Sequence, residues 1–222
     1  EEEAMASLSR AVAVRPTYAE AHNNLGALLR NAGRYQEAIE HFEMALQNKT
    51  GYVAAMNNRG VALHALNRFQ EAAAIYREAL LLDPAHTELL SNLGAALNML
   101  GDIDEALAVT TRAIEIAPRH VGALNNLATS WKQQGELDKA IAAYREAMRL
   151  KPDDPVAHSN LVYLLHFRPD MDAPALLAEH RTGGVARGEP LRATILPHDN
   201  SREPQRRLRI IGGQWRGRKF RF

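Results

Sequence analysis

The chain of 222 residues is 46% hydrophobic, carries 27 Lys and Arg against 26 Asp and Glu, and contains no cysteine. This composition supports one continuous core, excludes disulfides, thiolate metal sites and cysteine nucleophiles, and leaves no apolar run of about 18 residues that could cross a membrane. The charge is uneven, since residues 181–222 hold 11 basic and 3 acidic residues whereas residues 1–180 hold 16 and 23. We therefore expect an acidic folded part in a cytoplasmic setting, followed by a basic tail.

Residues 1–18 are predicted to form a partial unit with one helix. Ala4, Leu8 and Ala11 recur at helical spacing, and Pro16 follows them as a boundary. The chain starts with three glutamates and with the second half of a unit, which predicts that it is a piece of something longer.

One phrase, typified by Ala21-His22-Asn23-Asn24-Leu25-Gly26, then returns every 34 residues without insertion. Its asparagines are Asn24, Asn58, Asn92, Asn126 and Asn160. A period of about 34 residues indicates units of two helices joined by a turn. We therefore predict an all-α fold with complete units at 19–52, 53–86, 87–120 and 121–154.

Small and large residues at fixed offsets explain how each unit packs. Small residues occupy the predicted close contacts of the first helix (Gly26, Gly60, Gly94, Ala128) and of the second (Ala38, Ala72, Ala106, Ala140). Gly33, Asn67, Gly101 and Gly135 stand where the first helix must stop. A large ring fills the wider space in three units (Phe42, Tyr76, Tyr144), but Thr110 replaces it in the third, where we expect a local weakening.

Arg59 replaces a core leucine, and we expect its stem to pack and its head to reach water.

This pattern resembles the tetratricopeptide repeat from about residue 4 to about residue 165, and the resemblance implies a right-handed superhelix. Residues 155–180 depart from it, because Arg168-Pro169 replaces the turn glycine and Pro174 replaces the close-packing alanine. We expect a degenerate capping repeat there, completing a solenoid over residues 1–180. Residues 181–222 lose helical periodicity and are expected to be a basic, irregular tail.

The repeated asparagines are the sharpest candidates for a binding site. An amide both donates and accepts hydrogen bonds, so an evenly spaced row can hold the backbone of an extended peptide. The alternative is that each amide bonds only to the neighbouring repeat. We call the five residues the asparagine ladder.

A second row lies about a turn and a half beyond the ladder and is expected on the same inner face. It consists of Arg30, His64, Asn98, Lys132 and His166. These residues are candidates for selecting clients by charge, although a solvated face needs no function. A clamp for a C-terminal carboxylate needs Lys one residue before the ladder asparagine and Asn three residues after it, and no unit has either. The nine histidines show no metal-ligand spacing, so neither that clamp nor a metal site is predicted.

A narrower resemblance involves Leu161-Val162-Tyr163-Leu164-Leu165-His166, Glu179-His180-Arg181 and residues 198–210. It is similar to the segment joining repeats to the catalytic domain in bacterial relatives of O-linked N-acetylglucosaminyltransferase, the SPINDLY-like group. That resemblance implies a substrate-selecting arm whose ladder engages client proteins. The match stops at Ile210, and no catalytic or sugar-nucleotide residue of that family has a counterpart here. We therefore expect no catalysis and no cofactor from this chain.

Three classes of partner follow from these observations. Protein or peptide clients are the main prediction, and self-association as a scaffold is the alternative. Residues 215–222 interleave basic and aromatic residues, which is weak evidence for nucleic acid. A frame change or junction near residue 211 also explains that run.

Overall fold

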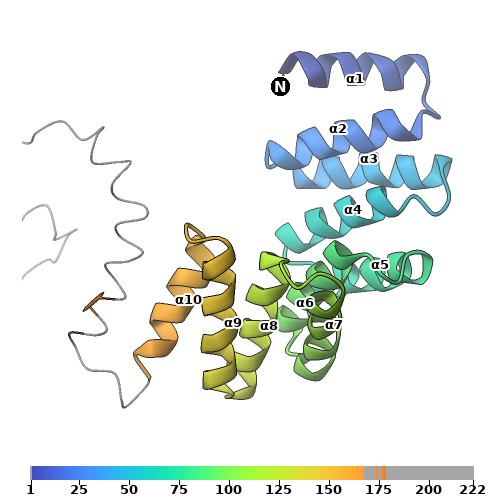
Figure 1. Ribbon diagram of the computed structural model, residues 1–222. Helices are drawn as coiled ribbons and strands as arrows, with labels where there is room; N and C mark the ends of the chain where they lie inside the picture. The colour runs from blue at the N-terminus through green and yellow to red at the C-terminus, as the bar shows by residue number, and fades with distance from the viewer. Residues whose placement is uncertain (1, 168–173, 175–176, 179–222) are drawn as a thin grey trace, which may run out of the picture. The chain divides into compact units, whose positions relative to one another are not determined.

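The computed structural model describes residues 2–167, 174, 177 and 178. Ten α-helices follow one another between residues 2 and 165, and the described residues contain no strand (Figure 1). The helices are α1 (Glu2–Val14), α2 (Ala19–Asn31), α3 (Tyr35–Asn48), α4 (Val53–Ala65), α5 (Phe69–Leu82), α6 (Thr87–Leu100), α7 (Ile103–Ile116), α8 (Val121–Gln134), α9 (Leu137–Leu150) and α10 (Pro155–Leu165). The predicted all-α solenoid is confirmed.

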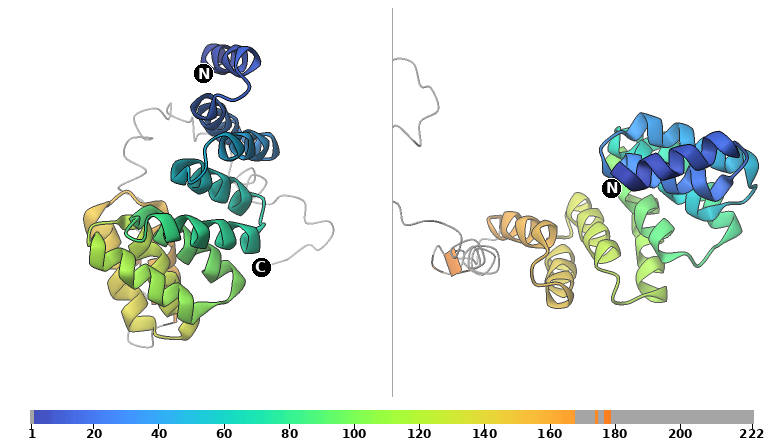
Figure 2. Two further views of the ribbon diagram at one scale, coloured as in Figure 1. Left: turned by 90° about the vertical axis from the view of Figure 1, so that its right-hand side faces the viewer. Right: turned by 90° about the horizontal axis from the view of Figure 1, so that it is seen from above.

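Each helix packs against the next in the chain, and the even-numbered helices α2, α4, α6 and α8 also contact one another in sequence. The two further views show the same consecutive stacking (Figure 2). We call α2–α3 repeat 1, α4–α5 repeat 2, α6–α7 repeat 3 and α8–α9 repeat 4. Contacts restricted to neighbouring repeats are the mark of a solenoid, in which stability adds up from repeat to repeat.

The first helix of each repeat ends where the sequence predicts. Gly33, Gly101 and Gly135 have φ of 76°, 83° and 86°, and Asn67 reaches 59°. Glycine, and less readily asparagine, adopts this left-handed conformation, so these residues stop one helix and start the turn to the next.

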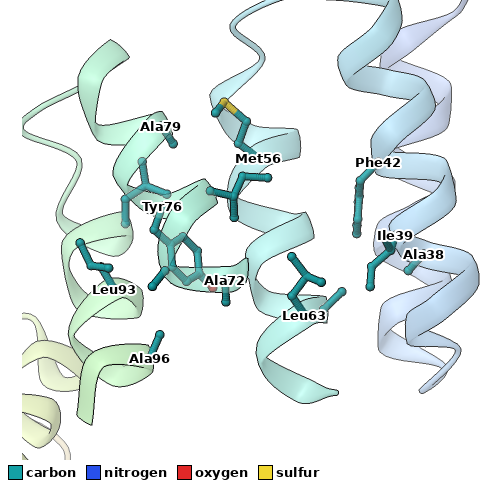
Figure 3. Packing of buried hydrophobic residues seen from close by; sticks show 14 of the residues in the cluster. Ala38, Ile39, Phe42, Met56, Leu63, Ala72, Tyr76, Ala79, Leu93 and Ala96 are labelled. Atoms are coloured by element: carbon teal, nitrogen blue, oxygen red, sulfur yellow. The ribbon is translucent and has the colours of Figure 1, made fainter. Parts of the chain in front are cut away.

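The core consists of the small and large residues that the pattern singles out. Phe42, Tyr76 and Tyr144 are buried completely or nearly so, and the close-packing alanines have no exposed surface. The ring of Tyr76 lies among the buried side chains of the core (Figure 3). A methyl group at Gly60 would overlap Cε1 of this ring, so the ring occupies the space that a side chain would need. The glycine is therefore a packing requirement of repeat 2.

Repeat 3 has Thr110 at the position where the other repeats have a ring. Thr110 is fully buried, and its hydroxyl donates to the carbonyl of Ala106 at 2.6 Å. A methyl group at Gly94 would overlap Cγ2 of Thr110, so the two helices lie close together around this smaller side chain.

Some predicted features fall outside the described residues. Most of the degenerate turn at residues 168–180 and all of the tail at residues 181–222 lie there. The ten helices between residues 2 and 165 therefore carry the site described below.

Candidate functional site

The asparagine ladder lies along the first helices, with one residue each on α2, α4, α6, α8 and α10. Asn24 is exposed, whereas the other four are partly buried. Part of each side chain therefore remains open to solvent.

The amide nitrogens of the three middle rungs connect successive repeats. Nδ2 of Asn58 donates to Oδ1 of Asn23 at 3.0 Å, and Nδ2 of Asn92 donates to Oδ1 of Asn57 at 3.0 Å. Nδ2 of Asn126 donates to the backbone carbonyl of Ser91 at 2.8 Å. The nitrogen of each of these three amides is therefore used in bonding between repeats, which is the alternative to client binding.

The oxygens of these amides differ in whether they accept a hydrogen bond. A guanidinium only donates, so Arg30 Nη1, 2.8 Å away, fixes Oδ1 of Asn58. A carbonyl only accepts, so Ser91 fixes Asn126 with its nitrogen toward repeat 3. Oδ1 of Asn92 and Oδ1 of Asn126 accept no hydrogen bond from any described residue. Each middle amide is therefore oriented by its nitrogen, and those of Asn92 and Asn126 leave an acceptor vacant.

The two end rungs are less constrained. Asn24 receives only a long hydrogen bond of 3.4 Å from Asn23. Asn160 makes no bridge to Asn125. Within residues 2–167 the Oδ1 of Asn125 is buried without a partner, while its Nδ2 donates to Asp154 at 3.0 Å. Asp154 also caps α10 through the backbone nitrogen of Val156 at 2.9 Å, so the cap aspartate replaces the inter-repeat bond at this end.

The second row is not uniform, because Asn98 is buried between α6 and α8. Its Nδ2 donates to the carbonyl of Asn126 at 2.9 Å, and its Oδ1 accepts from Ser130 at 2.7 Å. Asn98 has no exposed polar group with which to choose a client.

The other members of the row remain nearer the surface. The ring of His64 stands edge-on to Phe69 with centroids 4.9 Å apart, and its Nε2 is buried without a partner among the described residues. Burial lowers the pKa of His64, which favours the neutral ring. Lys132 lies 5.9 Å from the centroid of Tyr163, and Nδ1 of His166 lies 2.8 Å from the carbonyl of Val162.

Tyr163 and Phe167 form an exposed aromatic pair that the sequence prediction did not include. Their ring centroids lie 5.0 Å apart, and the two side chains are 56% and 59% exposed. The available signal was Tyr163 itself, since the equivalent positions hold Ala27, Val61, Ala95 and Thr129. This pair adjoins the last rung of the ladder on α10.

Metal ligands do not gather in the described part of the chain, where no group of three or more potential ligands occurs. No helix described is long and apolar enough to cross a membrane.

Comparisons with known proteins address the family. Models of the tetratricopeptide repeat match residues 17–85 and 63–130, and a model described as TPR repeat matches residues 131–166. Among curated protein sequences, none matches this chain.

Several solved structures share the fold. TTC0263, a thermophilic TPR protein in Thermus thermophilus, is 22% identical with a TM-score of 0.67, over 79% of this chain and 95% of that chain. MamA from Desulfovibrio magneticus RS-1 is 20% identical with a TM-score of 0.63, over 80% and 97%. YrrB, described as a TPR protein with an unusual peptide-binding site, is 19% identical with a TM-score of 0.60, over 85% and 98%.

Identities of this size establish a common fold. The family models together span residues 17–166, and the paired helices, glycine stops and buried rings agree with them. The chain belongs to the tetratricopeptide repeat family.

Proposed function

We propose that this protein binds extended peptide segments along the face that carries the asparagine ladder. The observation that supports this most directly is the orientation of the middle amides. Their nitrogens are engaged between repeats, and the oxygens of Asn92 and Asn126 are vacant. Backbone N–H groups of a peptide are the matching donors, and recognition of the backbone tolerates many side-chain sequences.

Preorganisation is the physical advantage of this arrangement. An amide already held by one hydrogen bond loses little freedom when its oxygen accepts another. Of the remaining second-row residues, Arg30 and Lys132 would then select among peptides by charge, whereas His64 and His166 would contribute through their rings. YrrB, which shares the fold, is described as binding peptide, and this agrees with the proposal.

The test uses peptides selected on the wild-type chain from a random decapeptide library. Asn92→Ala and Asn126→Ala together should weaken their affinity about tenfold, the equivalent of two modest hydrogen bonds. Asn48→Ala on α3 is the matched control, since Asn48 bonds only within its own helix. Circular dichroism confirms that helicity is retained.

A second arm examines the peptide. Methylation of alternate backbone nitrogens removes donors without changing side chains, so it should abolish binding in one register and spare it in the other. Equal binding by the wild type and the double variant, or by peptides methylated in either register, contradicts the ladder proposal.

A narrower form of the proposal concerns the parent protein. The similarity of residues 198–210 to the SPINDLY-like group supports a cytoplasmic, substrate-selecting arm of a protein O-glycosyltransferase. The family models match only the repeats, so this form rests on those residues alone. Capture of serine- and threonine-rich acceptor peptides over matched peptides without hydroxyls would support it, and no preference would count against it.

Self-association as a scaffold is the competing function. It predicts a mass that rises with concentration in light scattering and peptide binding that is absent. A monomer that binds the selected peptides excludes it.

A further inference from the structure

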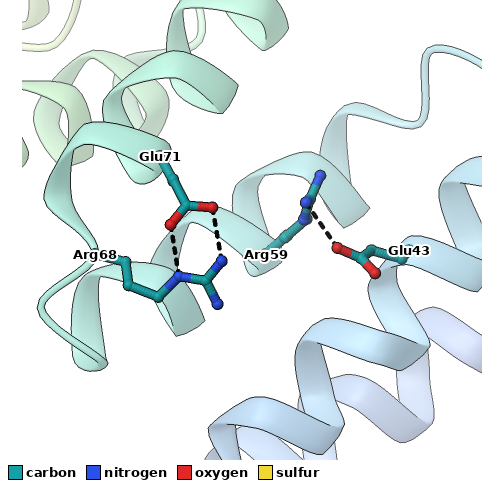
Figure 4. A network of polar contacts seen from close by, with 4 residues as sticks. All are labelled: Glu43, Arg59, Arg68 and Glu71. Atoms are coloured by element: carbon teal, nitrogen blue, oxygen red, sulfur yellow. Dashed lines mark hydrogen bonds and ion pairs between the residues drawn. The ribbon is translucent and has the colours of Figure 1, made fainter.

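Repeat 2 departs from the others at Arg59. The equivalent residues are Leu25, Leu93, Leu127 and Leu161, and Leu25, Leu93 and Leu161 are buried. Arg59 instead directs its Nη2 to Oε1 of Glu43 on α3 at 2.7 Å, with 29% of the side chain exposed (Figure 4). A mostly buried charged side chain therefore stands here at a position where the other repeats have leucine.

A hollow of about 380 Å³ lies beside Arg59, between α3, α4 and α5. Its apolar lining includes Leu46, Met56, Ile75 and Leu82. Smaller hollows on the other sides of Arg59 extend it toward Gln47 and toward Ala74, which makes a groove. No ladder residue lines any of the three hollows.

A second departure falls on the same groove. Leu81 lines the hollow and is 82% exposed, whereas the equivalent residues are Gln47, Glu115 and Arg149. Leu82 beside it is 54% exposed. Because repeats 1, 3 and 4 serve as internal controls, two exceptions that meet at one groove indicate a built apolar surface.

The groove also contains a donor without an acceptor. Nε of Arg59 is buried and makes no hydrogen bond within the described chain. Leaving a buried, charged donor unpaired is unfavourable, and an acceptor in the groove would gain a charge-assisted hydrogen bond once the side chain of Arg59 turns its Nε toward the hollow. A peptide carbonyl is an acceptor of suitable size.

The charges around the groove favour a cationic partner. Glu43 is paired with Arg59, and Glu71 with Arg68 at 2.6 Å. Glu78 lines the hollow and has no ion pair in the described part of the chain. The rim therefore carries one uncompensated negative charge.

We infer that this groove is a second binding site, which takes a peptide segment with a large aliphatic side chain next to Lys or Arg. The aliphatic side chain fills the hollow against Met56 and Ile75. The side chain of Arg59 turns to donate Nε–H to a peptide carbonyl, and Glu78 pairs with the basic side chain. The site is independent of the ladder.

The experiment measures fluorescence anisotropy of a labelled hexapeptide, Gly-Arg-Leu-Lys-Leu-Gly, on the full chain. A peptide with glutamate in place of both basic residues should bind more weakly, and the difference should shrink in high salt. Arg59→Leu should reduce affinity about tenfold or more, because the donor is lost, while raising the melting temperature, because leucine removes a buried charged donor that has no acceptor among the described residues. Loss of binding in a more stable variant cannot come from unfolding.

Matched variants distinguish binding in the groove from binding at the asparagine ladder. Glu115→Leu gives repeat 3 the same exposed apolar pair beside the buried Leu93, and should bind no additional peptide. Asn92→Ala with Asn126→Ala should leave hexapeptide binding unchanged. Unaltered binding by Arg59→Leu, or loss of hexapeptide binding in the ladder variant, overturns the inference. A dimer that Arg59→Leu dissociates, without hexapeptide binding, identifies a second copy as the occupant and also overturns it.

Discussion

The contacts between α4 and α6 and between α6 and α8 occupy the same repeat positions but differ in strength. One hydrogen bond between side chains, from Asn92 to Asn57, connects α4 and α6. Between α6 and α8, Asn98 bonds to Ser130 and to the carbonyl of Asn126, and Gln133 donates to the carbonyl of Asn98 at 3.2 Å. These helices also lie against each other over a longer stretch. Equal sequence spacing therefore does not imply equal coupling between repeats.

The residue facing the next helix accounts for the difference. Asn98 fits between α6 and α8 and satisfies both of its polar ends there. The equivalent His64 is a larger ring, Ala96 stands at the position equivalent to Ser130, and Nε2 of His64 is buried without a partner in the described part of the chain. A buried amide with all its bonds made adds to specificity and stability, whereas an unpaired nitrogen subtracts from both.

The largest expected effect comes from breaking the α6–α8 contact. Asn98→Leu keeps the side-chain size but removes the bonds to Ser130 and to the carbonyl of Asn126, which keep only their 3.0 Å bond to each other, and should cost about 1–3 kcal/mol of unfolding free energy. Urea denaturation measures the loss. Ser130→Ala completes a double-mutant cycle, and additive effects of the two changes would contradict a shared network.

Removing the single bond at the other contact should cost less. Asn92→Ala removes one partly exposed hydrogen bond, and we expect a loss of about 0.5–1.5 kcal/mol. Hydrogen exchange should show faster opening in α4 and α6 than in α8. A loss as large as that of Asn98→Leu would mean that the two contacts are equivalent.

The stronger contact can also be transplanted. His64→Asn with Ala96→Ser places the Asn98 and Ser130 pair between α4 and α6, and should stabilise the chain by about 0.5–1 kcal/mol. Thermal and urea unfolding measure the gain, with Ala96→Ser alone as control. A loss would show that the contact of His64 with Phe69 matters more than the new bond.

The smallest effect is a dependence on pH. Burial lowers the pKa of His64, and burial followed by the nearby His22 lowers the pKa of His41. Below about pH 6.5 the unfolded chain takes up protons more readily than the folded one, so stability falls as pH decreases. The melting temperature should drop between about pH 7.5 and pH 5.5, and less in His64→Asn. An equal drop in the variant would assign the effect to His41 or to other groups.

The structural features that could be predicted from the sequence depend on residues that lie close together in it. The 34-residue period predicted the helix order, and Gly33 or Gly135 stops its helix because local backbone chemistry requires it. Arg59 was expected to reach water with its stem packed. Its side chain is 29% exposed and pairs with Glu43, but the sequence did not indicate that its Nε would be buried without an acceptor among the described residues.

Contacts between repeats could not be predicted in the same way. Whether Asn126 meets the carbonyl of Ser91 or a side chain, 35 residues earlier, depends on how two helices cross. Asn98 was grouped with Arg30 and Lys132 by position, yet a small neighbour, Ser130, lets it become part of the interior. The partners of a repeated residue depend on both repeats that it joins, and a periodic pattern describes only one.

Thr110 affects which substitutions repeat 3 can accept. Since α6 and α7 have closed around it, introducing the ring found in repeats 1, 2 and 4 would now meet Gly94 with no space between the helices. A substitution toward the family consensus is thus unfavourable here, although it would restore the average sequence. Equivalent positions therefore have different surroundings in different repeats, and one substitution can have opposite effects on stability in two of them.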